Sequence, residues 1–517
     1  MHVLFPTMTF ALFFVVVLGV SWKLNDRPFE WKIFVLASSY LFYSWADWRF
    51  CFLLAGSTVG NWLFAAAVHR ARSDAGAKRW MLGGVGLNLV VLGFFKYYGF
   101  FVESALGVLE PLGLAATPLL IKVALPVGIS FFTFCSISYV IDVFRQDQDP
   151  VGFLDFAVYL SFFPHLVAGP IGRVSEFEPQ LRHRPDGRSI DATRAVRLIC
   201  RGMFKKVVIA NFLATAIVDP VFVAPGQFRN WELLVGAWAY AVQIYADFSG
   251  YTDIAIGIAL LMGVKFPDNF DQPYSARTIQ EFWRRWHMTL SRWLRDYLYI
   301  PLGGNRGGPN AEYRNLFLTM LLGGLWHGAN WTFLIWGAFH GVGLALERRH
   351  AVRRAELAAT GPATRPPPTG TAAEDERLAR LLREGEDETQ VMARPQVPPA
   401  QAQPEPGMNK WLARLWVFHF VVVGWIFFRA PSVTVALDYL VSLVTNWGVG
   451  TLVTPVVLLA VVVGMIGQFV PRRFGDMLEF RASKLPPVVM AVGVGVFLLA
   501  INLLGPQGVA PFIYFDF

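Results

Sequence analysis

An uncharged stretch from Asn315 to Leu346 constrains the fold of this chain more than any other segment. It contains no Lys, Arg, Asp or Glu, and a helix needs only about 20 such residues to cross a bilayer. One of its histidines, His327, lies twelve residues into the stretch, and at 1.5 Å per residue this places it roughly 18 Å deep, near the bilayer midplane. A histidine at that depth is either a functional group or a structural one bonded to a neighbouring helix.

Small and polar residues surround this histidine. Gly323, Gly324 and Gly328 flank it, which predicts that the helix is broken or closely packed there. Trp326 and Asn330 carry an indole N–H and an amide beside it, so we expect both to line a cavity.

The composition indicates a polytopic membrane protein. The 517 residues are 55% hydrophobic and 16% charged, with a mean hydropathy of +0.44. The net charge of +8 fits basic cytoplasmic loops, and no nucleic-acid motif accompanies it. The three cysteines are far apart in apolar surroundings, so neither a disulfide framework nor a metal site is expected.

A basic amphipathic helix is predicted from Arg277 to Tyr297, directly before the uncharged stretch. Its tryptophans share one face, its arginines share the other, and His287 lies at the border. Such a helix lies at a membrane interface, where the arginines meet either lipid phosphates or an anionic ligand. The candidate ligand-binding arginines are Arg284, Arg285, Arg292 and Arg295.

A glycine-rich turn, Pro301 to Pro309, follows the basic helix. It contains Asn305 and Arg306 and matches no phosphate-loop pattern. It is either a flexible connector or a backbone that approaches a ligand closely.

Further apolar runs predict the remaining membrane segments. The first run lacks a basic n-region and a small-residue cleavage site, so it is expected to be a retained span. The run 153–169 ends in prolines before a basic segment, which predicts a re-entrant or half-inserted segment. With the uncharged stretch, full spans are expected at 1–23, 33–45, 50–68, 81–102, 119–143, 204–223, 233–264, 411–428, 452–469 and 485–504, and a short helix at 435–447.

Two carboxylates interrupt the run 233–264. Asp247 and Asp253 must pair or face a wet cavity at that depth. Either they bond between helices or they line the cavity near the histidines.

The chain divides into two membrane parts. The first part is 1–346, with 277–341 as its catalytic region, and the second is 411–510. The interval 347–410 is proline-rich and of low hydrophobicity, which predicts a disordered cytoplasmic loop with a short helix at 373–383. Basic residues before the last span predict that the tail 511–517 is extracytoplasmic, and the N-terminus is expected to be extracytoplasmic as well.

Several blocks together resemble the membrane-bound O-acyltransferase superfamily. These blocks are RRWHMTLSRWLRDYLYIPLGGNR, LWHGANWTFLIWGAFHG, LPVGISFFTFCSISYVIDV, FFPHLVAGPIGR, DFSGYTDIAIG and the ending PFIYFDF. The chain is most similar to the branch of the alginate O-acetyltransferase membrane subunit, which includes subunits for peptidoglycan and cellulose acetylation. The interval from Glu347 to Lys410 departs from that branch, and Asp516 stands where the family tail usually has Gln.

The resemblance implies an all-α polytopic fold of about 11–13 membrane helices with re-entrant segments and a central funnel. It implies catalytic roles for His327, for His287 as the upstream polar residue, and for Tyr514 as the acyl acceptor. It also implies acetyl-CoA as the cytoplasmic acyl donor, with the basic residues at the funnel mouth, and no metal.

The implied function is O-acetylation of an exported polysaccharide at the bacterial inner membrane. A soluble periplasmic esterase-like partner would carry the acetyl group to the sugar. A D-alanyl or lipid O-acyltransferase, a transporter and a non-catalytic scaffold are the alternatives.

Overall fold

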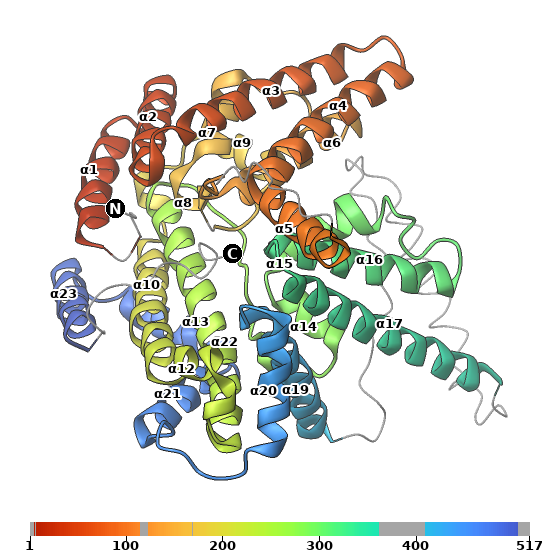
Figure 1. Ribbon diagram of the computed structural model, residues 1–517. Helices are drawn as coiled ribbons and strands as arrows, with labels where there is room; N and C mark the ends of the chain where they lie inside the picture. Colours follow the sequence, from red (N-terminus) through yellow and green to blue (C-terminus); the bar gives the residue numbers. More distant parts are fainter. Residues whose placement is uncertain (1–4, 6, 114–122, 168, 361–408, 505–517) are drawn as a thin grey trace, which may run out of the picture.

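The computed structural model describes residue 5 and residues 7–113, 123–167, 169–360 and 409–504. The regular elements over these ranges are helices (Figure 1), as the sequence predicts. Five helical segments there are long and apolar enough to cross a bilayer: 50–70, 74–112, 192–223, 230–261 and 410–429.

The N-terminal helices form one group, drawn in red and orange in Figure 1. It contains α1 (Met8–Lys23), α2 (Pro28–Asp47), α3 (Phe50–Arg70), α4 (Asp74–Leu92) and α6 (Ile129–Phe144). The buried amides of Asn61 and Asn88 bond to each other, with N···O distances of 2.5 and 3.3 Å. Such pairs hold helices together in hydrocarbon, where no water competes for them, so they fasten α3 to α4.

The helix α4 continues into a π-helical turn and a further helix. The turn is η1 (Gly93–Tyr97), and it is followed by α5 (Tyr98–Leu109) and a short turn, η2 (Glu110–Leu112). Single π-helical turns inside α-helices are frequent at functional sites.

The centre of the molecule is α13 (Asn230–Leu261), whose side chains are almost all buried. It packs along α10 (Ala192–Met203) and the π-helical η4 (Phe204–Ala210). Gly202 and Gly250 allow this close approach, because a Cβ at Gly202 would lie 2.4 Å from the Gly250 carbonyl oxygen. The path from η4 runs on through α11 (Asn211–Leu213), η5 (Ala214–Val218) and α12 (Asp219–Val223).

The uncharged stretch folds back on itself instead of forming one straight span. Helix α16 (Pro309–His327) ends at His327, and α17 (Trp331–Thr360) returns beside it (Figure 1). Two glycines face each other across this hairpin: a Cβ on Gly324 would lie 2.3 Å from the Phe333 carbonyl oxygen, and one on Gly337 would lie 2.5 Å from the Met320 carbonyl oxygen. The expected break at the glycines is present, and it reverses the chain.

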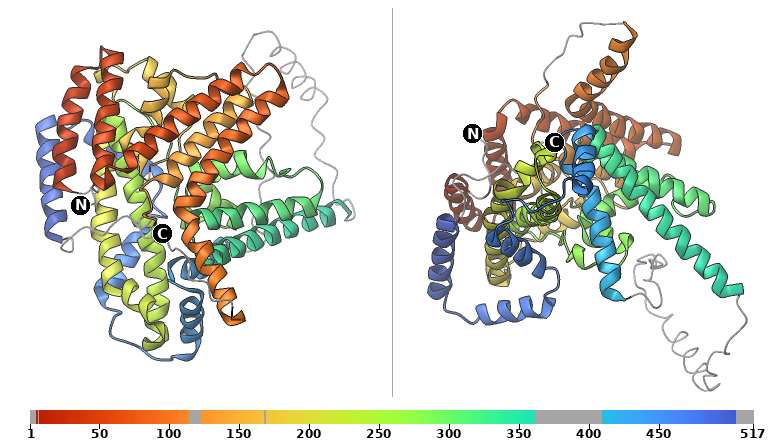
Figure 2. Two further views of the ribbon diagram at one scale, coloured as in Figure 1. Left: turned by 45° about the horizontal axis from the view of Figure 1, so that its top comes forward. Right: turned by 60° about the horizontal axis from the view of Figure 1, so that its bottom comes forward.

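The boundary expected at residue 346 falls inside a helix. Helix α17 continues to Thr360 and projects beyond the body of the molecule in both views of Figure 2. The reason is that 347–360 keeps helix-forming Glu, Arg and Ala residues, while the proline-rich part begins later. The rest of the expected loop, including the short helix at 373–383, lies outside the described residues.

The run 153–169 is divided between two short helices, α7 (Phe153–Ser161) and α8 (Phe163–Leu166). Both are too short to cross a bilayer, and most of their side chains are buried in the protein. Backbone of this kind is tolerated at membrane depth when protein surrounds it. Helix α9 (Val174–Arg182) follows.

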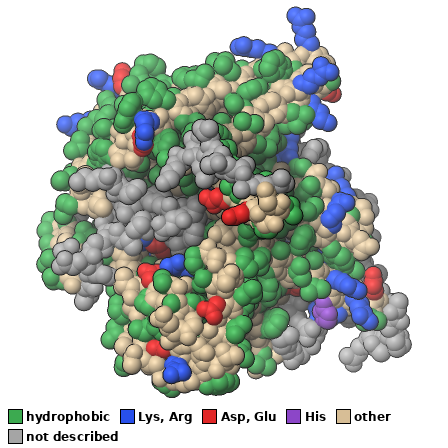
Figure 3. All heavy atoms as spheres, in the orientation of Figure 1, with side chains coloured by type: hydrophobic (Ala, Val, Ile, Leu, Met, Phe, Trp, Pro, Cys, Tyr) green, Lys and Arg blue, Asp and Glu red, His purple; other side chains and the backbone are tan. Residues whose placement is uncertain are grey.

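The C-terminal part adds α19 (Lys410–Arg429), α20 (Val433–Thr445), α21 (Pro455–Ile466), α22 (Arg472–Ala482) and α23 (Pro487–Leu504). Helix α19 packs against both α17 and α13 and so closes the region around the tip of the hairpin. The face shown in Figure 3 carries many hydrophobic side chains, with most of its basic side chains toward the upper and right-hand margins and several acidic ones nearer the middle.

Candidate active site

The first site element is a sharp break at His287. The predicted continuous helix from Arg277 to Tyr297 is wrong: α14 (Ile279–Arg285) and α15 (Met288–Leu294) are separate, and a π-helical turn, η8 (Arg295–Tyr299), follows. His287 lies between them with a left-handed φ of 43°. For a residue other than glycine this conformation costs energy and persists only where its surroundings impose it.

Contacts with the side chain of Asn269 impose the break. Its side-chain oxygen accepts hydrogen bonds from the Thr289 backbone N–H at 3.1 Å and the Thr289 hydroxyl at 2.9 Å. The same oxygen lies 3.1 Å from His287 Nδ1. Because this oxygen can only accept, Nδ1 carries the proton and a neutral His287 keeps its lone pair on Nε2. His287 Nε2 is fully buried and has no hydrogen-bond partner among the described residues.

The second site element is His327 at the tip of the α16–α17 hairpin. Its side chain is 3% exposed. The His327 ring centroid lies 4.9 Å from that of Trp326, 5.0 Å from Trp336 and 5.3 Å from Phe428. The Trp326 ring in turn lies 6.4 Å from the His287 ring. The structure therefore brings the His287 and His327 rings beside the same indole, that of Trp326, although forty residues separate the two histidines in the sequence.

Further tryptophans, from three parts of the chain, pack around the two histidines. Trp286 precedes the break, and its ring centroid lies 5.0 Å from that of Trp425 on α19. Trp425 stacks on Trp336 at 5.8 Å. We call Trp286, Trp326, Trp336, Trp425 and Phe428 the aromatic cluster. It excludes water from the two histidines and so strengthens electrostatic interactions there.

A third buried histidine, His340, borders the aromatic cluster and was not singled out from the sequence. Trp283 Nε1 donates a 3.3 Å hydrogen bond to its Nδ1, so a neutral His340 carries its proton on Nε2. His340 lies inside the same uncharged stretch as His327, and the argument that singled out His327 applies to it equally.

Several polar groups around the histidines lack hydrogen-bond partners among the described residues. They are the indole N–H groups of Trp326 and Trp336 and the Nε2 atoms of His287 and His340. Buried polar atoms are almost always paired, since an unpaired one costs about 1–3 kcal/mol. A substrate with carbonyl and hydroxyl oxygens could satisfy them: the indoles can only donate, and a neutral His287 Nε2 accepts.

Lys96 and Tyr97, which were not among the predicted site residues, hold the end of α16. Lys96 Nζ donates to the carbonyl oxygens of Trp326 at 2.7 Å and His327 at 3.0 Å, and the Tyr97 hydroxyl donates to that of Leu325 at 2.9 Å. The signal was present, because Lys96 is the one charged residue between Trp80 and Val102.

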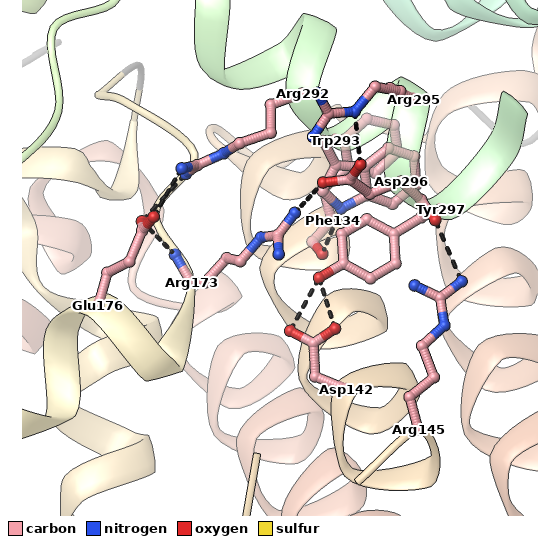
Figure 4. A network of polar contacts seen from close by, with 10 residues as sticks. All are labelled: Phe134, Asp142, Arg145, Arg173, Glu176, Arg292, Trp293, Arg295, Asp296 and Tyr297. Atoms are coloured by element: carbon pink, nitrogen blue, oxygen red, sulfur yellow. Dashed lines mark hydrogen bonds and ion pairs between the residues drawn. The ribbon is translucent and has the colours of Figure 1, made fainter. Parts of the chain in front are cut away.

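The arginines expected to hold an anionic donor are mostly engaged by carboxylates in this structure. Figure 4 shows Arg292 in a two-pronged pair with Glu176, at 2.6 and 3.0 Å, and Arg295 bonded to Asp296 at 2.7 Å. Arg285 pairs with Glu281 on its own helix. Arg284, Asn305 and Arg306 are exposed. Donor binding by this set therefore stays a prediction.

Arg173 and Tyr297 extend the network of Figure 4. Arg173 pairs with Asp296, and the Tyr297 hydroxyl donates to Asp142 at 2.6 Å. Trp293 stacks on Phe134 with ring centroids 3.6 Å apart. Because Phe134 also stacks on Trp326 at 5.1 Å, this network and the aromatic cluster are in contact through α6.

The carboxylates of α13 pair with cations of the neighbouring helix. Asp253 bonds to Arg201 at 2.5 and 2.8 Å and to Lys205 at 2.9 Å, and Asp247 pairs with Lys206. These contacts match the first of the two expected arrangements, in which the carboxylates bond between helices. Phe248, between the two carboxylates in sequence, contacts the His287 ring at 4.7 Å.

Asn330 ties the hairpin turn to the end of α19 by donating to the Pro431 carbonyl oxygen at 3.0 Å. It also accepts a 3.0 Å bond from the Thr332 backbone N–H. Tyr514 lies outside the described residues.

We predict that Asp247→Asn destabilises the fold. Lys206 and Asp247 are 1% and 5% exposed, and removing one member of a buried pair costs about 3–5 kcal/mol because the other charge stays buried. The measurement is the melting temperature of the detergent-solubilised protein. Asp268→Asn is the control, since Asp268 and its partner Arg194 are exposed and such a pair contributes about 0–1 kcal/mol. Equal melting temperatures for both variants would contradict the prediction.

Comparison with known proteins gives the family. The family model for membrane-bound O-acyltransferases matches residues 115–369, which include both His287 and His327. The peptidoglycan O-acetyltransferase of Helicobacter pylori is 34% identical over 475 residues, covering 86% of this chain and 80% of that protein.

For two further relatives, the match covers a smaller share of the relative's own length. The probable alginate O-acetylase of Pseudomonas aeruginosa is 48% identical over 349 residues, covering 66% of this chain, and the match spans 65% of that protein. The teichoic acid D-alanyltransferase of Streptococcus thermophilus is 30% identical over 231 residues, covering 42% of this chain and 56% of that protein. The expected family is thereby confirmed: this chain belongs to the membrane-bound O-acyltransferase family.

Proposed function

We propose that this protein is a membrane O-acetyltransferase that moves acetyl groups from cytoplasmic acetyl-CoA across the inner membrane for O-acetylation of an exported polysaccharide. One observation carries the proposal. Two buried histidines flank Trp326, and His287 Nε2 and the neighbouring indole N–H groups have no hydrogen-bond partner among the described residues. A base beside N–H donors in a water-poor site is what acyl transfer requires.

The chemistry assigns a role to each group. An acceptor hydroxyl oxygen bonds to the thioester carbonyl carbon while His327 takes the hydroxyl proton. The oxyanion that forms accepts hydrogen bonds from Trp326 or Trp336, whose indoles can only donate. The carbon–sulfur bond then breaks, and the thiolate recovers the proton from His327. His287, whose Nδ1 bonds to Asn269, orients the thioester or stabilises the oxyanion as an imidazolium, because only a protonated Nε2 can donate to an oxygen. Direct acetylation of His327 is the mechanistic alternative.

The donor is acetyl-CoA, and it enters from the cytoplasm. Two exposed cations, Arg284 just before the break and Arg306 in the glycine-rich turn, support binding of its phosphates at the mouth of a funnel. The carboxylate-bound arginines of Figure 4, Arg292 and Arg295, would join them by exchanging Glu176 and Asp296 for phosphate oxygens.

The acceptor approaches from the outer side. Tyr514 is the proposed hydroxyl, and both ends of the chain face outward. An esterase-like periplasmic partner with its own nucleophile then passes the acetyl group to the sugar. The relatives named for alginate and peptidoglycan O-acetylation support a polysaccharide as the final acceptor, with an alginate-like polymer favoured.

The test is transfer of radiolabelled acetyl from acetyl-CoA to the purified full-length protein. We expect label on the wild type, and on Tyr514→Phe a loss of at least about 100-fold, because the acceptor oxygen is gone. Tyr313→Phe is the control, since Tyr313 is a tyrosine of α16 at the opposite end from His327.

Other results of this experiment would favour a different acceptor or a different function. Label that persists in Tyr514→Phe but is lost in His327→Ala would make the tail a docking element and point to His327 as the acceptor. Transfer from a D-alanyl carrier protein but not from acetyl-CoA would favour the activity for which the Streptococcus thermophilus relative is named. If the protein neither becomes labelled nor hydrolyses the thioester, this would contradict an enzyme and favour a transporter or a scaffold.

A further inference from the structure

Lys96 is a cation within an apolar membrane segment. It lies in η1, with Trp80 and Val102 bounding a run that otherwise carries no charge. The three hydrogen bonds that it makes to described residues end on neutral oxygen atoms, not on a carboxylate. A charged group inside a membrane is costly, so a cation without a carboxylate partner in the described part of the chain calls for a functional explanation.

The three hydrogen bonds of Lys96 converge on the end of α16. Nζ donates to the carbonyl oxygens of Trp326 at 2.7 Å and of His327 at 3.0 Å, and to the Ser130 hydroxyl at 3.3 Å. An ammonium group has three N–H donors, so these contacts use them all. No donor remains for a substrate, and Lys96 therefore acts through the residues it holds.

The contacts are suited to fix the last turn of α16. The final carbonyl groups of a helix have no partner within the helix and carry its negative dipole, so a cation there is stabilising. The Lys96 ammonium also lies 5.9 Å from the Trp326 ring centroid, within reach of a cation–π interaction. The Tyr97 hydroxyl holds the preceding carbonyl, that of Leu325.

We propose that Lys96 is a positioning residue for His327. Its ammonium group clamps the backbone of Trp326 and His327 and links it through Ser130 to the start of α6, so that the imidazole keeps its place beside Trp326 and His287. The activity readout below rests on the proposed acetyl transfer, whereas the structural readout does not.

The experiment compares Lys96→Met and Lys96→Arg in the full-length protein. Met keeps the length of the side chain without charge or donors, and Arg keeps both. Two quantities are measured: hydrogen exchange of the backbone amides in 324–331, and kcat and KM for acetyl-CoA.

In Lys96→Met we expect faster exchange in 324–331 and a kcat lower by about 100-fold, the cost of a misplacement of about 1 Å. KM should stay within about twofold, because donor binding is untouched. The kcat of Lys96→Arg should be at least about tenfold higher than that of Lys96→Met, since the charge and donors return.

Lys32→Met is the matched control, because Lys32 pairs with Asp155 and joins α2 to α7 away from His327. It should leave the exchange of 324–331 and kcat unchanged. Equal losses in Lys32→Met and Lys96→Met would overturn the proposal, since loss of a cation would then act only through general stability. Unchanged exchange in Lys96→Met would overturn it as well.

Failure of the wild type to transfer acetyl would sink the proposed function, while the exchange measurement would still decide the role of Lys96. Should Lys96→Met not yield monodisperse protein, Lys96→Gln is measured in the same way. It lacks the charge but retains an amide donor.

Discussion

Replacing His327 with Ala should lower the rate of acetyl transfer by about 10²–10⁴-fold, the usual contribution of a positioned base. The imidazole is the group that takes the acceptor proton in the proposed reaction, and it lies 4.9 Å from Trp326 and 5.0 Å from Trp336, ring centroid to ring centroid. Alanine leaves the indole donors in place but removes the base. The measurement is release of coenzyme A from acetyl-CoA in the presence of an acceptor.

His69→Ala is the control for this variant. His69 is exposed in the last turn of α3, so its loss should leave the rate unchanged. Size-exclusion profile and melting temperature separate a chemical effect from misfolding. A folded His327→Ala protein that turns over within about threefold of the wild type would give this histidine a structural role and contradict the base assignment.

Replacing Gly337 with Val should both destabilise the protein and lower the rate of transfer by about 100-fold. A Cβ on Gly337 would lie 2.5 Å from the Met320 carbonyl oxygen and 3.1 Å from the Gly324 Cα. These atoms are backbone and cannot move without opening the α16–α17 hairpin. Overpacking of this kind costs about 1–3 kcal/mol, and a shift of about 1 Å at His327 costs about 100-fold in rate.

Gly86→Ala is the matched control for the hairpin variant. Gly86 lies in α4, and a Cβ there would meet nothing within 4 Å. Alanine should therefore be neutral or stabilise by up to about 1 kcal/mol, because it favours the helix. The measurements are melting temperature and acetyl transfer. A Gly337→Val protein as stable and as active as Gly86→Ala would show that the hairpin does not hold the site.

The apolar runs predict the positions of the longest helices, but not every length: where full spans are expected at 119–143 and 452–469, the described residues contain helices of 16 and 12 residues, α6 and α21. A run of bilayer length with few charges has few alternatives in lipid, and α3, α13 and α19 follow the runs 50–68, 233–264 and 411–428 closely. The glycines around His327 likewise predicted the break at the end of α16. What the sequence did not reveal is that the chain reverses there, since this depends on the packing of Gly324 against Gly337.

The break at His287 could not be read from periodicity. The Trp and Arg pattern from Arg277 to Tyr297 fits one amphipathic helix, but Asn269 bonds to Thr289 and His287 and replaces the helical contacts. The pairing of Arg292 with Glu176 is similarly remote in sequence. Local patterns carry no information about such partners, so the arginines appeared available for a ligand.

Other site residues were within reach of sequence reasoning. Lys96 is a lone charge in an apolar run, and His340 shares the uncharged stretch with His327. Both follow from the rule that singled out His327, namely that polar groups in a membrane are costly.

The location of the acyl-transfer centre is tested most directly by a structure of the full-length protein bound to a non-hydrolysable thioether analogue of acetyl-CoA. We expect the acetyl carbonyl to lie between His327 and His287, with its oxygen within about 3.2 Å of the Trp326 or Trp336 indole nitrogen, the range of an N–H···O hydrogen bond. An analogue seated elsewhere, with its carbonyl separated from His327 by the rings of the aromatic cluster, would contradict it.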